Sequence, residues 1–164
     1  KLIGNILSDS SILLVILLLL INGVILLSTK NKNNKGNNYK ILLKQAIIIG
    51  LMQSFAFFPG ISRSGITITT MLYLGISREK AFGFSFIIAI PIIIAGFVLE
   101  SLSNPVCING NNFIFILISI LVSFIVGLFS LKLLKYFVIK TKFYFFGYYC
   151  IGLSIFLFCF QFFI

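Results

Sequence analysis

Pro59-Gly60-Ile61-Ser62-Arg63-Ser64-Gly65-Ile66-Thr67 is a polar stretch inside an otherwise apolar sequence. An arginine near the centre of a bilayer costs roughly 2.5–3.5 kcal/mol on insertion scales, so an intramembrane arginine is by default a candidate functional residue. The stretch surrounds Arg63 with hydroxyls and glycines, namely Ser62, Ser64, Thr67, Gly60 and Gly65. Guanidinium, hydroxyl and backbone N–H groups all bind phosphate oxygens. The stretch therefore predicts an anion site inside a membrane protein.

The composition of the whole chain agrees with a membrane location. Of the 164 residues, 60% are hydrophobic and only 10% are charged, whereas soluble proteins carry about 25% charged residues. The net charge of +10 comes mainly from lysines that cluster between apolar runs, which is typical of cytoplasmic loops. We therefore expect an all-α polytopic membrane protein and no nucleic-acid partner.

Hydropathy predicts four membrane-spanning helices and one shorter pair of segments. A span needs about 20 apolar residues to cross about 30 Å of hydrocarbon, and four segments qualify: Ser11–Ser28, Ala81–Leu99, Phe113–Leu131 and Phe143–Ile164. A fifth apolar stretch, Ile41–Phe58, runs into the polar motif. The segment after the motif, Ile66–Ile76, would form a helix of only roughly 16 Å, which is half a membrane.

The loops determine how this short segment is placed. Ser28–Lys44 holds five lysines and Lys132–Lys142 holds four, whereas Ser101–Asn112 has neither lysine nor arginine. The positive-inside rule puts the first two loops in the cytoplasm and the third outside. Lys44 and Lys80 then lie on the same side. The segment Ile66–Ile76 is too short to span the membrane. Residues 41–76 are therefore predicted to form a re-entrant helix–loop–helix, with one helical arm on each side of the motif and the motif at the tip.

Local signals suggest where these arms end. Ser64 is the expected N-cap of the second arm, and Gly75 is expected to end it. Pro91 is expected to kink the following span. We expect the group Arg78, Glu79 and Lys80 to form a solvated helix start.

The tip has the chemistry of a phosphate site. A helix N-terminus there would offer unpaired N–H groups and the positive end of the helix dipole, and Arg63 would supply a planar fork that matches phosphate. Thr70 would extend the polar stripe of Thr67 along the helix, and Gln53 is expected to line the site. Two alternatives stay open. Arg63 could pair with backbone carbonyls or extend to the membrane–water interface. The hydroxyl groups could form hydrogen bonds with carbonyls of their own helix.

The histidine and cysteine content argues against a metal site within this chain. The chain has no histidine, and its three cysteines lack metal-ligand spacing. No metal site is predicted within this chain.

The residues that carry a resemblance to a known family are Gln53–Thr67, Gly75–Arg78, Phe84–Phe86 and Ile88–Pro91. In these residues the chain resembles the undecaprenyl-diphosphate phosphatase family, the bacitracin-resistance type of bacterial membrane enzyme. The resemblance implies a multi-pass protein of the inner membrane. It also implies hydrolysis of a C55 polyprenyl diphosphate to the monophosphate that carries peptidoglycan precursors.

The same resemblance assigns roles to the motif. Arg63 and Ser62 are expected to be catalytic. Phosphate binding is expected of Ser62, Arg63, Ser64, Gly65 and Thr67. Residues expected to line or support the site are Gln53, Gly60 and Thr70.

The chain also departs from the family pattern. Family members are longer and consist of two inverted repeats, the first of which carries a glutamate-rich motif and a Ser/His segment, and nothing in Lys1–Lys44 matches either. We expect residues 1–164 to be a single membrane domain, the C-terminal portion of that fold, and to be inactive alone. The implied divalent cation, Mg²⁺ or Ca²⁺, would have its ligands outside this chain.

The expected partners are a polyprenyl diphosphate, the bilayer and the missing N-terminal half, with a second copy of the chain as a further candidate. One alternative function is a transporter or flippase that binds a lipid phosphate or another anion without hydrolysis. A membrane scaffold without a site is the other.

Overall fold

The structure is a computed structural model that describes residues 9–32, 41–103, 110–140 and 142–163, and the regular elements in these ranges are all helices. The α-helices are α1 (Asp9–Leu27), α2 (Leu43–Ser54), α3 (Arg63–Tyr73), α4 (Arg78–Ser103), α5 (Gly110–Ile139) and α6 (Phe145–Phe163). Short 3-10 helices, Ser28–Asn31 and Phe55–Phe57, extend α1 and α2. The predicted all-α class is confirmed.

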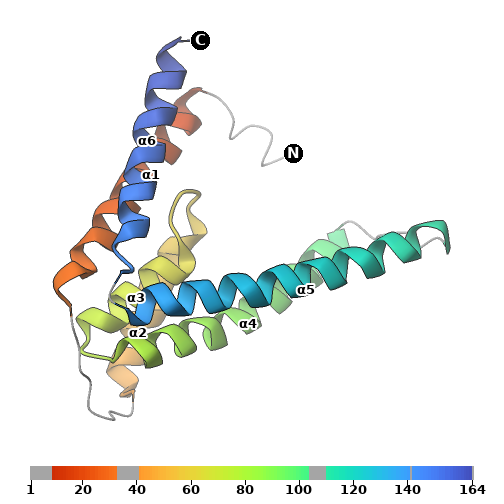
Figure 1. The fold of residues 1–164 in the computed structure, drawn as a ribbon, viewed down its shortest axis with the longest axis horizontal. Coiled ribbons are helices and arrows are strands. Elements are labelled where there is room, and N and C mark those ends of the chain that lie inside the picture. The colour runs from red at the N-terminus through yellow and green to blue at the C-terminus, as the bar shows by residue number, and fades with distance from the viewer. Residues whose placement is uncertain (1–8, 33–40, 104–109, 141, 164) are drawn as a thin grey trace.

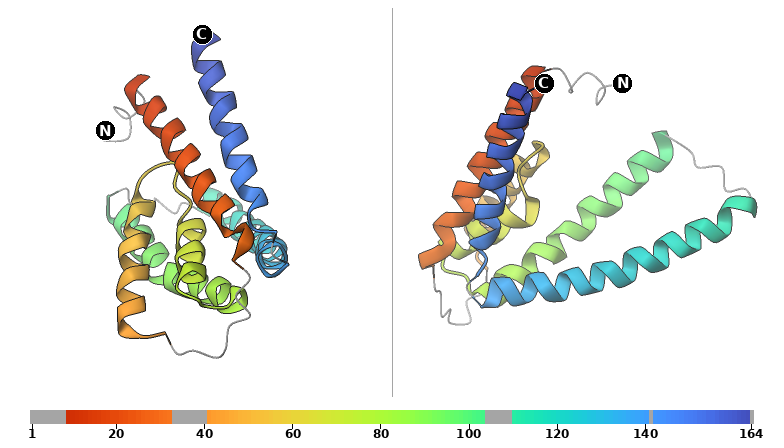
Figure 2. Two further views of the ribbon diagram at one scale, coloured as in Figure 1. Left: turned by 90° about the vertical axis from the view of Figure 1, so that its left-hand side faces the viewer. Right: turned by 45° about the horizontal axis from the view of Figure 1, so that its top comes forward.

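The helices form three antiparallel pairs (Figures 1 and 2). The first and last helices, α1 and α6, lie side by side, and the shorter pair α2 and α3 packs against α1. The long pair α4 and α5 projects away from the others and opens toward its far end. The chain is thus an open assembly in which the short hairpin occupies the junction.

Small residues bring α1 and α6 close together. A Cβ built on Gly147 would lie 2.7 Å from the carbonyl oxygen of Gly23, and one on Gly23 would lie 3.0 Å from the carbonyl oxygen of Gly147. Nearer the opposite end, the buried hydroxyl of Ser154 donates to the carbonyl of Ile16 at 2.9 Å. Close backbone approach at small residues is a usual way for membrane helices to associate.

The short hairpin, α2 followed by α3, is a helix–loop–helix with the motif at its tip. At its open end, the Gln45 side chain donates to the carbonyl of Leu74 at 3.4 Å, so the two ends of the hairpin lie together. At the tip, the Ser62 N–H bonds the Asn22 side chain. Asn22 lies near the middle of Ile12–Asn31, a stretch long and apolar enough to span a membrane. The tip therefore reaches only half the length of that span.

The shortest α-helix, α3, lies at the centre of the core. Every residue from Gly65 to Leu72 is buried, although the segment contains three threonines. Ile68, Met71 and Leu72 form a cluster with apolar side chains of the neighbouring helices. A half-length helix with polar residues is thus enclosed by protein, which is where backbone ends at membrane depth are tolerated.

The ends of α3 differ from the prediction at one side only. The helix begins at Arg63 with Ser62 as the N-cap, because the Ser62 hydroxyl accepts the N–H of Gly65 at 3.1 Å. The predicted N-cap, Ser64, is inside the helix. At the other end Gly75 has φ of +83°, and the N–H groups of Gly75 and Ile76 bond the carbonyls of Leu72 and Met71. This is a Schellman ending, as a glycine in this position predicts.

The long helices extend beyond the predicted spans. Helix α4 continues through Pro91 to Ser103, and α5 continues to Ile139, so most of the predicted loop Lys132–Lys142 is helical. Lysine is a good helix former, and the apolar residues between the lysines favour continuation. Among the described residues, three helices are long and apolar enough to span a membrane. The fourth predicted span corresponds to α6, whose apolar part Phe145–Gln161 is at the short end of the spanning range.

The prediction of a solvated helix start at Arg78, Glu79 and Lys80 is wrong for Arg78. Its side chain is only 6% exposed and its guanidinium donates to the carbonyls of Thr29 at 3.0 Å, Lys32 at 2.7 Å and Val138 at 3.3 Å. The neighbouring Glu79 and Lys80 are exposed, as predicted. Arg78 therefore ties the ends of α1 and α5 to the start of α4, because its guanidinium donates to backbone carbonyls at those ends.

Candidate functional site

The turn at the hairpin tip is held against the middle of α1. Gly60 has φ of +101°, a conformation that glycine adopts readily. A Cβ at this position would lie 3.0 Å from the Val15 carbonyl oxygen and 3.1 Å from the Leu18 Cβ. Gly60 thus allows the turn to approach α1 closely. The structure places it against α1 rather than in the lining of the Arg63 cavity described below.

Asn22 connects α1 to the first residues of the motif. Its side-chain oxygen accepts the N–H of Ser62 at 3.1 Å, its amide nitrogen donates to the Cys150 sulfur at 3.4 Å, and it is only 1% exposed. Ser62 is also the N-cap of α3. Asn22 therefore determines where the N-terminus of α3 lies relative to α1.

The N-terminus of α3 retains groups that bind anions. Ser62 uses a lone pair to accept the Gly65 N–H, which leaves its own proton free to donate. Its hydroxyl lies 3.5 Å from that of Ser64. Within the described residues, the N–H groups of Arg63 and Ser64 have no acceptor, as expected for a first helical turn. A Cβ on Gly65 would lie 2.9 Å from the Ser62 Cβ, so glycine is needed for this tight cap.

Arg63 lines a small cavity beside the tip. The cavity has a volume of about 190 Å³ and is formed by α2, the 3-10 helix, α3 and Ile92 of α4. Gln53 also lines it, and its side-chain oxygen is buried without a partner among the described residues. In the same part of the chain, no oxygen pairs with the Arg63 guanidinium. The structure thus brings Arg63 and Gln53 to the same cavity.

Two predicted site residues lie elsewhere. The Thr67 side chain is fully buried, donates to the Arg63 carbonyl at 2.8 Å and contacts the Ser85 hydroxyl of α4. The Thr70 hydroxyl donates to the carbonyl of Ile66 at 2.8 Å and lines a different cavity. Both hydroxyls bond their own helix, which is the alternative that the sequence left open.

Sequence reasoning missed Asn22 and Ser85. Asn22 is the only polar side chain between Ile12 and Leu27, and a polar residue in a predicted span is itself a signal. Ser85 carries no such signal, because serine is common in membrane helices and only the packing of α3 on α4 brings it to Thr67.

Acidic residues do not line the cavity that holds Arg63. The three in the chain are Asp9 at the start of α1, and Glu79 and Glu100 in the first and last turns of α4. Among the described residues, no group of histidine, cysteine and acidic side chains could hold a metal ion. The residues around Arg63 therefore do not fit a divalent cation by themselves, and they carry positive charge instead.

Comparison with known proteins agrees with the motif. A family model described as "Bacitracin resistance protein BacA" matches residues 1–156. The undecaprenyl-diphosphatase of Thermosipho africanus is 45% identical over 121 residues, which are 74% of this chain and 46% of the relative. That of Korarchaeum cryptofilum is 38% identical over 122 residues, 73% of this chain and 45% of the relative.

A third curated relative, the undecaprenyl-diphosphatase of Treponema denticola, is 40% identical over 115 residues, 70% of this chain and 43% of the relative. The chain thus spans about half the length of the curated relatives that it matches. No solved structure matches it.

Proposed function

The chain belongs to the BacA family of bacitracin resistance proteins, and on this basis we propose that it forms the phosphate-binding part of an undecaprenyl-diphosphatase. The reaction would break the bond between the terminal phosphorus and the bridging oxygen of a C55 polyprenyl diphosphate. Water would supply the new oxygen on phosphorus, and the products would be inorganic phosphate and the lipid monophosphate. The location would be the bacterial inner membrane, where this carrier lipid is recycled for peptidoglycan synthesis.

The observation that supports this proposal most strongly is the state of Arg63. Its guanidinium has no partner among the described residues, lines a cavity and lies at the start of α3. A buried or half-buried cation without a counter-ion is unfavourable in a membrane, so an anionic ligand would stabilise it. The volume of about 190 Å³ is below the about 300–1,000 Å³ of typical small-molecule sites. It suits a phosphate group, with the polyprenyl chain outside.

The neighbouring groups would complete a clamp for the diphosphate. Arg63 would contact two phosphate oxygens through its fork, while the Ser62 and Ser64 hydroxyls and the free N–H groups of the first turn would contact others. Preorganised donors of this kind lower the barrier because negative charge redistributes over the transferred phosphoryl group. Thr67 would act by holding the first turn of α3 against Ser85 and not by contact with phosphate.

The remaining chemistry would come from outside this chain. The proposed partner is the N-terminal half of the same fold, which would bring the carboxylates for a divalent cation.

Substitution of Arg63 tests the proposal. In the full-length protein with Mg²⁺ present, Arg63→Ala should reduce phosphate release from a polyprenyl diphosphate by at least about 100-fold, which is the loss typical of one preorganised donor. Arg63→Lys should also be impaired, because a point charge does not replace a fork. Lys135→Ala, which removes an exposed cation on α5, is the matched control and should retain activity.

Thermal unfolding of each variant separates loss of function from loss of fold. Turnover within threefold of wild type in a folded Arg63→Ala variant would reject the proposed role. If the full-length protein bound the lipid diphosphate through Arg63 but released no phosphate, the alternative of a transporter or flippase would be favoured. Half-helix ends near mid-membrane are also found in transporters.

A further inference from the structure

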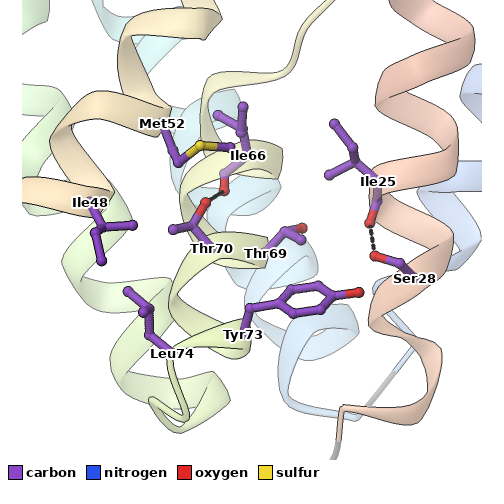
Figure 3. Close-up of a pocket in the computed structure, with 9 residues that line it drawn as sticks. All are labelled: Ile25, Ser28, Ile48, Met52, Ile66, Thr69, Thr70, Tyr73 and Leu74. Atoms are coloured by element: carbon purple, nitrogen blue, oxygen red, sulfur yellow. Dashed lines mark hydrogen bonds between the residues drawn. The ribbon is translucent and has the colours of Figure 1, made fainter. Parts of the chain in front are cut away.

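A second cavity lies on the side of α3 that faces α1. It has a volume of about 400 Å³ and is bordered by α1, α2 and α3 (Figure 3). It shares no lining residue with the cavity that holds Arg63. Its size is within the range of small-molecule sites, which are mostly apolar with a few convergent polar groups.

Thr69 supplies an unpartnered polar group in this cavity. Its side chain is only 4% exposed, and its hydroxyl has no hydrogen-bond partner among the described residues. Thr67 and Thr70, by contrast, bond carbonyls of the preceding turn. In Figure 3 the Thr69 hydroxyl points across the cavity toward α1. A buried hydroxyl without a partner is unfavourable, so an occupant with a hydrogen-bond acceptor would stabilise it.

The rest of the cavity is amphipathic along its length. Around Thr69 the lining is apolar, with Ile48 and Met52 of α2 and Ile25 of α1. Tyr73, near the end of α3, also borders the cavity, and the Lys32 ammonium lies 4.3 Å from the centre of its ring. An apolar groove with one internal donor and a cation at its mouth matches the chemistry of a lipid with an anionic head group.

We propose that this cavity binds one acyl chain of an anionic glycerophospholipid. The ester carbonyl accepts a hydrogen bond from Thr69, and the phosphate lies near Lys32. Thr69 precedes Tyr73 by four residues, a rise of about 6 Å along α3, which matches the few bonds between an ester carbonyl and the phosphate. A polyprenyl chain carries no acceptor along its length and would leave Thr69 unpaired. The ester lipid is therefore favoured over the proposed substrate.

Lipid binding to the purified protein in mild detergent tests this site, with phosphatidylglycerol as the probe and native mass spectrometry as the readout. Wild type should retain one phosphatidylglycerol. Thr69→Val should weaken its binding by about fivefold, the effect of one hydrogen bond, and Thr69→Ser should restore it. Thr70→Val is the matched control, because that hydroxyl lines the same cavity but is already paired. Lys32→Gln should abolish the preference over phosphatidylcholine.

Stability without lipid gives an independent readout. In lipid-free detergent, Thr69→Val should unfold at no lower temperature than wild type, because a methyl group replaces an unpaired hydroxyl. A destabilised Thr69→Val protein, or one that binds phosphatidylglycerol as tightly as Thr70→Val does, would overturn the proposal. Displacement of the bound lipid by a polyprenyl monophosphate at equal concentration would also overturn it, in favour of the substrate chain as the occupant.

Discussion

The two arginines of this chain have opposite surroundings. Arg78 is buried and its guanidinium bonds three backbone carbonyls, whereas Arg63 is half-buried and has no partner among the described residues. The two terminal nitrogens of Arg78 are occupied by the fold, whereas those of Arg63 can donate to a ligand. Position in a sequence does not reveal this difference, because the partners of Arg78 are 40 or more residues away along the chain.

Asn22 is the residue on which the geometry of the tip depends. Asn22→Leu removes the acceptor of the Ser62 N–H, which should displace the first turn of α3. We expect kcat/KM for polyprenyl diphosphate hydrolysis by the full-length protein to fall by about tenfold or more, since small misplacements of positioned groups are costly. The control is Ser154→Ala, which removes another buried bond of α1 but none to the tip. Equal losses in both variants would mean that Asn22 has no specific role.

Arg78 should matter for stability. Arg78→Met leaves the carbonyls of Thr29, Lys32 and Val138 without this donor. We expect the free energy of unfolding to fall by about 2–4 kcal/mol, given the penalty of roughly 1–3 kcal/mol for a buried unpaired group. Denaturant titration in detergent measures this loss. An unchanged unfolding midpoint would show that water replaces the guanidinium at these carbonyls.

Between elements, the contact of α1 with α6 depends on glycine. Gly147→Ala would place a Cβ 2.7 Å from the Gly23 carbonyl oxygen, whereas a Cβ on Gly152 of the same helix has no atom within 4 Å. Overpacking of this kind costs typically about 1–3 kcal/mol. Thermal unfolding in detergent should show a clear loss for Gly147→Ala and none for Gly152→Ala. Equal behaviour of the two variants would mean that α1 and α6 do not pack at this register.

Much of the element plan could be predicted from the sequence. Apolar length located the spans, and the short segment after the motif, together with the loop charges, predicted the hairpin. The positions of single side chains were harder to predict, because they depend on contacts between segments that are far apart in the sequence. The N-cap of α3 is Ser62 and not the predicted Ser64, because Asn22 and Gly60 hold the turn against α1. Thr67 does not face the predicted ligand site, because its hydroxyl contacts that of Ser85 on α4.

At the scale of the whole molecule, the helices meet in one junction at the short hairpin, and the pair α4 and α5 projects from it as one arm. At this junction the tip of the hairpin lies against the middle of α1, and Arg63 shares a cavity with Ile92 in the middle of α4, while the apolar window of α5 has no residue buried within the described structure. Such an arm suits contact with lipid or with the proposed other half of the fold. The site around Arg63 lies at the junction, where added segments could reach it.

The side of the membrane on which each end of the hairpin lies tests the fold most directly. In a background with Cys107, Cys150 and Cys159 replaced by serine, Lys44→Cys, Lys80→Cys and Ser101→Cys can be labelled with a membrane-impermeant maleimide in sealed vesicles of known orientation. A re-entrant hairpin that brings Arg63 to mid-membrane predicts cytoplasmic labelling of positions 44 and 80 and outer labelling of position 101. Labelling of positions 44 and 80 from opposite sides would show that the segment crosses the bilayer, and would contradict the proposed site.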